Sequence, residues 1–183
     1  MFPKNYWKGA AQELKKPKVL AVSALFLALS MAIGSAFIPL PNNLRIYFTF
    51  LPKALCAAVC GPVAALVFGF AEDILGFALH PTGGFFFGYT LSTMLGMLIY
   101  ALGFYRAKIG IVRIAITKLA VNLICNVGLG ALWSAILYGK AYVFYAASSL
   151  VKNLLLWPLE TILLVIVFKT LLPIMEKEKL IRK

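Results

Sequence analysis

The sequence predicts an all-α integral membrane protein with six transmembrane helices, folded as a single membrane domain over residues 1–183. Of the 183 residues, 62% are apolar and only 13% are charged, whereas a soluble domain has about 45–50% apolar and about 25% charged residues. Inside a membrane each backbone amide must be satisfied internally, so spanning segments are helices or closed barrels. The apolar runs are long and do not alternate with polar residues, which argues against barrel strands.

Six hydrophobic segments follow one another along the chain. The first is long enough to cross a bilayer of about 30 Å, and we expect it to be retained rather than cleaved as a signal peptide. Gly61-Pro62 divides the next apolar stretch into two shortened helices, because proline cannot continue a helical hydrogen-bond ladder and favours a first turn. The expected helices are residues 19–38, 46–60, 62–77, 89–104, 111–137 and 146–172, the last kinked at Pro158.

Basic residues gather at both ends of the chain and between the fourth and fifth helices. The loops on the other side hold only Arg45 and Lys140. Cytoplasmic loops are enriched in lysine and arginine, so we expect a multi-pass protein of the cell membrane with cytoplasmic segments 1–18 and 173–183. Although the net charge is +12, the basic residues form no stripe interleaved with exposed aromatics, and we expect no nucleic-acid binding.

Nine charged or amide side chains fall well inside the predicted spans, away from their ends. Such groups are costly at membrane depth and usually face a cavity or a partner. Any one of them could instead pair with another or lie at the end of a span, but for the whole set we favour a polar cavity. Lys118, Asn122 and Asn126 recur every four residues and so share one face of a helix. The full set is Lys53, Glu72, Asp73, Lys118, Asn122, Asn126, Lys152, Asn153 and Glu160.

The sequence carries no motif of a known catalytic centre. It lacks H-E-x-x-H, G-x-S-x-G and a P-loop, so the chain itself is not expected to hydrolyse a nucleotide. Its three cysteines all lie in apolar segments, where packing is the simplest role. We therefore predict no catalytic residue, no metal site and no cofactor.

Ala24, Ala28 and Ala32 are spaced four apart on the first helix. Small residues at this spacing let helix backbones approach closely in lipid. From spacing alone, packing inside the bundle and docking of a partner helix explain the row equally well.

Taken together, these features resemble the substrate-binding S-components of the energy-coupling factor (ECF) vitamin transporters, specifically the folate-specific one, over nearly the whole chain. One departure is that Ser148 and Ser149 stand where we expect an arginine in similar proteins. The segments that carry the resemblance are the alanine row, residues 45–52, Gly61-Pro62, Gly69-xxx-Asp73-xx-Gly76, residues 81–92, Lys118-xxx-Asn122-xxx-Asn126, Trp133, Gly139-Lys140 and Lys152-Asn153.

The resemblance implies high-affinity capture of folate from the outer face, with a membrane coupling protein and two ATPases as partners. It also implies that the alanine row faces the coupling protein, and that the subunit topples in the bilayer to release its vitamin inside. Capture of riboflavin, thiamine or pantothenate is the alternative, and a membrane enzyme or assembly factor is a more distant one.

Folate pairs a flat pterin head with a glutamate tail of two carboxylates, and the sequence offers side chains for both. The amide–amidine edge of the head suits carboxylate and Asn partners and stacks on aromatics, whereas the tail calls for Lys or Arg. We expect Asp73, Asn126 and Asn153 at the head, flanked by Trp133 and Phe48, with Phe86 in an aromatic lid over residues 83–88. For the tail we expect Arg45, Lys140 and Lys152.

Overall fold

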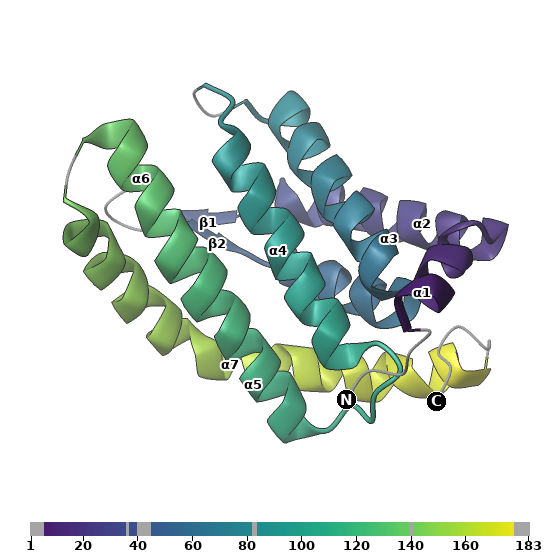
Figure 1. The fold of residues 1–183 in the computed structure, drawn as a ribbon. Helices are drawn as coiled ribbons and strands as arrows, with labels where there is room; N and C mark the ends of the chain where they lie inside the picture. The colour runs from purple at the N-terminus through teal and green to yellow at the C-terminus, as the bar shows by residue number, and fades with distance from the viewer. Residues whose placement is uncertain (1–5, 36, 40–44, 82–83, 140, 178–183) are drawn as a thin grey trace.

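The structure is a computed structural model, and it describes residues 6–35, 37–39, 45–81, 84–139 and 141–177. Helices dominate the described chain, and only one short pair of strands interrupts them (Figure 1). In order, the elements are α1 (Tyr6–Leu14), α2 (Pro17–Gly34), β1 (Phe37–Pro39), β2 (Arg45–Tyr47), α3 (Phe50–Leu79), α4 (Phe87–Phe104), α5 (Ile111–Val121), the π-helical segment η1 (Asn122–Leu129), α6 (Gly130–Tyr138) and α7 (Tyr142–Lys177).

Five described helical stretches are long and apolar enough to cross a membrane. They are residues 17–34, 50–79, 87–104, 111–138 and 142–177, the fourth being α5, η1 and α6 in continuous succession. Because α3 is broken at Gly61, it supplies two of the six expected helices. The predicted all-α membrane fold is therefore confirmed. At 36 residues, α7 is about 54 Å long, and it changes direction along its length (Figure 1), with Pro158 inside it.

The break in α3 folds the helix back on itself. Gly61 has φ 79° and ψ 177°, a conformation that is essentially restricted to glycine. In a straight helix residues 53 and 72 would lie about 28 Å apart, yet Lys53 Nζ is 2.9 Å from Glu72 Oε2. The two shortened helices predicted at Gly61-Pro62 are thus present, and their reversal brings two charged side chains together.

The connection from α2 to α3 differs from the prediction. The first spanning helix ends at Gly34 rather than at residue 38, and the next begins at Phe50 rather than at residue 46. Between them, β1 and β2 pair antiparallel, with Phe37 opposite Tyr47. Pro39 explains part of the error, because the residue before a proline is disfavoured in the α region and favours extended backbone.

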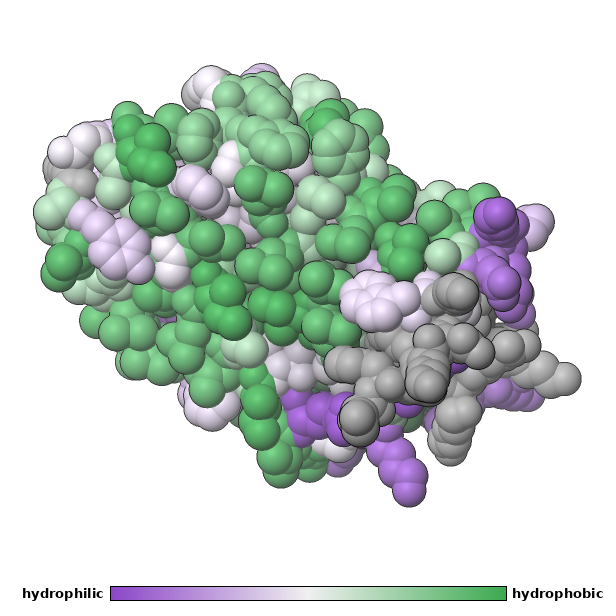
Figure 2. All heavy atoms as spheres, viewed as in Figure 1, coloured by the Kyte–Doolittle hydropathy of each residue, from purple (hydrophilic) through white to green (hydrophobic). Residues whose placement is uncertain are grey.

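Small side chains allow α3 and α4 to pack closely. A Cβ on Gly69 would lie 3.0 Å from the Met94 backbone, and the buried core of the bundle includes Ala54, Ala57 and Ala65 of α3. The sequence did not predict the helix α1, whose Ala10 forms a small separate buried cluster with Tyr105, just after α4. Apolar residues cover most of the face shown in Figure 2, and hydrophilic residues gather at the end where α1 begins and α7 ends.

Candidate functional site

A cavity of about 1310 Å³ lies inside the bundle. Binding pockets for drug-sized ligands commonly measure about 300–1,000 Å³, so a vitamin fits. Its lining comes from the helices α2, α3, α4, α5, α6 and α7, from η1, and from the loop before α4. Eight of the nine polar residues noted in the sequence line it, and the ninth, Asn122, is buried directly behind. The prediction of a polar cavity is confirmed.

Two ion pairs lie in the cavity lining. Lys53 pairs with Glu72, whose Oε1 also accepts a hydrogen bond from Ser30 Oγ at 2.9 Å. Lys118 Nζ is 3.1 Å from Glu160 Oε1 and 4.3 Å from the centre of the Phe50 ring. Both carboxylates are buried, and each pair joins segments that are far apart in the chain. Mutual pairing and a cavity are therefore not alternatives here, because the paired charges form part of the cavity wall.

A chain of amides leads from Glu160 to the cavity surface. Asn122 Nδ2 donates to Glu160 Oε2 at 2.8 Å, and Asn126 Nδ2 donates to Asn122 Oδ1 at 3.1 Å. Asn126 Nδ2 also donates to Asn153 Oδ1 at 3.0 Å, and Asn153 Nδ2 donates to the Ser149 carbonyl at 2.8 Å. Asn122 and Asn126 belong to η1, and π-helical turns often occur at functional sites.

Asp73 lines the same cavity and is held by α4. Its carboxylate accepts hydrogen bonds from Thr90 Oγ1 at 2.6 Å and from Thr93 Oγ1 at 3.4 Å. Two threonine hydroxyls thus hold this carboxylate in the cavity wall. Neutralisation of Lys152 by Asp73 stays an alternative to a role in ligand binding.

The predicted aromatic residues take different positions. Phe86 lines the cavity, and Trp133 packs behind it with ring centres 5.6 Å apart. Trp133 Nε1 donates to Ser92 Oγ at 2.8 Å. Phe48 is not among the residues that line the cavity; it packs beside Phe50, with ring centres 6.5 Å apart. Roles for Trp133 and Phe48 in flanking a ligand stay predictions, and the structure places both behind the wall.

Of the three cations predicted to bind the tail, the structure describes the side chain of one, Lys152. Lys152 lines the cavity and is half-buried. The backbone of Arg45 pairs with Pro39 in the two-stranded sheet, but the described residues do not include its side chain. Lys140 lies outside the described residues. Near both positions in the chain, Tyr47 and Tyr138 line the cavity.

Sequence reasoning missed several side chains of the cavity. Phe50, Tyr100 and Tyr145 line it, and Ser30 and Thr90 support its carboxylates. Ser30 and Thr90 carry the same signal as the residues that were found, a polar group in an apolar span. The aromatic residues carry no such signal, because rings at helical spacing also fill ordinary cores.

The alanine row lies on the surface of the chain. Ala24, Ala28 and Ala32 are all exposed, whereas Val22 and Phe26 of the same helix pack against the core. Packing of the row against neighbouring helices of this chain is therefore wrong. Docking of a partner stays a prediction.

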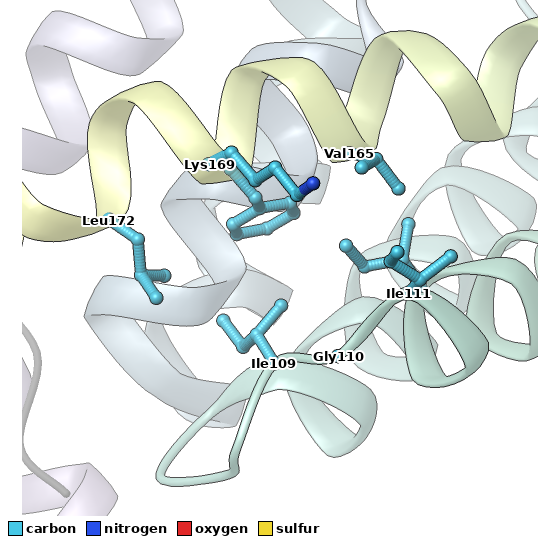
Figure 3. A pocket seen from close by; sticks show the side chains of 8 residues that line it. Ile109, Gly110, Ile111, Val165, Lys169 and Leu172 are labelled. Carbon is cyan, nitrogen blue, oxygen red and sulfur yellow. The ribbon is translucent and has the colours of Figure 1, made fainter.

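A second, smaller cavity of about 240 Å³ lies between α7 and the start of α5 (Figure 3). Its lining is apolar apart from Lys169 and the backbone of Gly110. Among the described residues that line it, Lys169 is the one polar side chain, so this cavity offers little to orient a polar ligand.

Comparison with known proteins identifies the family to which this chain belongs. The model of the family "ECF transporter, substrate-specific component" matches residues 18–168. The chain belongs to this family. As a substrate-specific component it is a multi-pass membrane subunit of a transporter rather than an enzyme, which confirms the class inferred from the sequence.

Similar members of the family carry a folate name. The chain is 30% identical over 152 residues to the folate transporter FolT of Clostridium novyi, covering 82% of this chain and 88% of that protein. It is 27% identical over 143 residues to FolT of Leuconostoc mesenteroides, covering 75% and 77%. A solved structure described as FolT bound with folic acid superposes with a TM-score of 0.75 at 25% identity, covering 82% of this chain and 92% of that one.

Proposed function

We propose that this chain is the folate-capturing subunit of an ECF importer. The observation that carries the proposal is the cavity: a polar wall of Asp73, Asn126 and Asn153, half-buried Lys152 and an adjoining aromatic ring, within a fold that resembles folic-acid-bound FolT. A flat head with several hydrogen-bonding groups and an anionic tail is the ligand chemistry that such a wall accommodates.

Within the cavity, the pterin head lies against Asp73, Asn126 and Asn153. A carboxylate is a strong acceptor for paired N–H groups, and Asp73 is oriented by the threonines of α4. Phe86 covers the head, with Trp133 holding that ring in place, and Phe48 supports Phe50 from behind. The glutamate tail meets Lys152, Arg45 and Lys140.

Family membership and the exposed alanine row support a set of partners. Ala24, Ala28 and Ala32 form a small-residue surface on which a coupling membrane protein docks, because small side chains allow close helix contact in lipid. Two ATPases supply the energy, and both chain termini are cytoplasmic. The cavity then opens toward the outer face, where folate is captured.

Equilibrium binding by calorimetry on the detergent-purified protein tests the ligand. Folic acid should bind saturably at one site, while riboflavin, thiamine and pantothenate should give no heat and should not compete. If one of those vitamins binds saturably and folic acid does not bind, that vitamin replaces folate in the proposal. If none of the four compounds binds, the proposal of vitamin capture is wrong.

A further inference from the structure

Three linked amides, Asn126 and Asn153 in the cavity wall and Asn122 behind it, lie between two groups that can only accept hydrogen bonds. At one end is the Glu160 carboxylate, ion-paired with Lys118 at 3.1 Å. At the other is the backbone carbonyl of Ser149, which accepts from Asn153 Nδ2. An amide side chain has two faces, one donating and one accepting. The acceptor at each end of this row of amides therefore determines which face the nearest asparagine turns toward it.

From the Glu160 end, the orientations follow one by one. The carboxylate requires Asn122 to present Nδ2, so Asn122 Oδ1 points to Asn126. From the other end, the Ser149 carbonyl requires Nδ2 of Asn153, so Asn153 Oδ1 also points to Asn126. Asn126 thus faces two acceptors and commits both hydrogens of Nδ2 to them. Its Oδ1 is left for the cavity.

Burial makes this orientation hard to reverse. Asn122 is 1% exposed and Asn153 is 3% exposed, so neither has bulk water as a substitute partner. Turning Asn126 over would place its oxygen against two other oxygens. Leaving buried polar groups without partners is unfavourable, and a fully satisfied buried network holds its members in one arrangement. Asn126 itself is exposed to the cavity.

We infer that Glu160 is a positioning residue that makes Asn126 an obligate hydrogen-bond acceptor, so that the site selects ligand heads carrying an N–H donor at that point. The inference rests on the proposed function for the identity of the ligand. In folic acid the donors of the head edge are N3–H and the 2-amino group. A head that presents a lone pair there meets the Asn126 oxygen and is rejected.

Two folic acid analogues test the selection. Aminopterin, the 4-amino analogue, replaces N3–H by a lone pair, and 2-desamino-folic acid lacks the 2-amino group. The wild-type protein should bind folic acid at least tenfold more tightly than one of them. In Glu160→Gln, the new side chain can donate to Asn122, which releases one of the two constraints on Asn126. The preference should then fall at least threefold, since the Ser149 carbonyl still holds the other end.

Glu72→Gln is the matched control. Glu72 is also buried, also paired with a lysine and also in the cavity lining, but it is outside the amide chain. It can weaken all ligands together, yet its ratio of folic acid to analogue should match that of the wild type.

Asn122→Leu provides a second route if Glu160→Gln fails to fold. This variant keeps the Lys118–Glu160 pair but removes the amide that links Glu160 to Asn126 by hydrogen bonds. The preference for folic acid over the analogue should therefore fall as well. The inference is overturned if wild-type protein binds folic acid and both analogues within threefold, or if neither variant changes the ratio. Absence of folic acid binding by the wild type contradicts the proposed function instead, so the two failures are distinguishable.

Discussion

Replacing Gly61 by alanine tests the reversal that shapes the cavity. The backbone there has φ 79° and ψ 177°, and an added Cβ would lie 2.9 Å from two atoms of the Tyr105 ring. The change therefore introduces backbone strain and a collision at one position. Both effects act on the turn that brings Lys53 to Glu72.

The magnitude follows from these two contributions. A non-glycine residue in such a region costs about 1–3 kcal/mol, and inserting a carbon into a packed site costs about 1–3 kcal/mol. Gly61→Ala should therefore destabilise the protein by roughly 2–6 kcal/mol. For a chain of this size about 1 kcal/mol corresponds to about 2–4 °C in Tm, so the Tm should fall by several degrees or more. Displacement of Lys53 should also weaken folic acid binding.

Thermal unfolding of the purified protein in detergent measures the loss. Gly110→Ala is the control, because a Cβ there meets nothing within 4 Å and its φ is −108°. Adding Tyr105→Leu to Gly61→Ala removes the collision but not the strain, so it should recover only part of the Tm. If Gly61→Ala has the same Tm as the Gly110→Ala control, the reversal of α3 does not depend on Gly61.

Three further results are expected. Ala28→Trp should abolish folate uptake by cells while sparing folic acid binding, whereas Leu155→Trp on α7, where the native side chain is also exposed, should spare both. Loss of binding in Ala28→Trp would contradict a docking role. Asp73→Ala should weaken folic acid and a bare pterin by the same factor, at least tenfold, while Lys152→Ala should weaken folic acid far more than the pterin; equal losses in Lys152→Ala would remove it from the tail site. Folic acid should protect the loop over residues 83–88 from proteolysis. Equal cleavage with and without folic acid would indicate that its phenylalanines lie at the membrane interface and do not form a lid.

Local chemistry made the broken helix and the polar face predictable. Gly61-Pro62 limits the backbone whatever surrounds it, so the two short helices could be placed from the sequence. The spacing of Lys118, Asn122 and Asn126 likewise put them on one helical face. That spacing did not reveal η1, because residues four apart lie on nearly the same face in both an α-helix and a π-helix.

Partner choice among the buried charges could not be predicted, because it depends on distant segments. Glu160 could have faced Lys53, Lys118 or Lys152, and only the packing of α5 against α7 brings it to Lys118. The short sheet was missed for a related reason. Its strands are three residues each, too short for alternation to separate them from helix ends.

Charge balance in the cavity gives an independent reason for the ligand's orientation. The described lining holds three lysines and three carboxylates, Lys53, Lys118 and Lys152 against Glu72, Asp73 and Glu160. The charges of these six residues sum to zero, so they cannot offset the two carboxylates of a folate tail. A neutral pterin head meets no such imbalance at this wall. The sequence predicts two further cations in the outer loops, Arg45 and Lys140, and we expect electrostatic attraction there to favour an anion near the entrance. Under the proposed function we therefore expect the tail to stay toward those loops while the head enters first, which is also the orientation that would bring its N–H edge to Asn126.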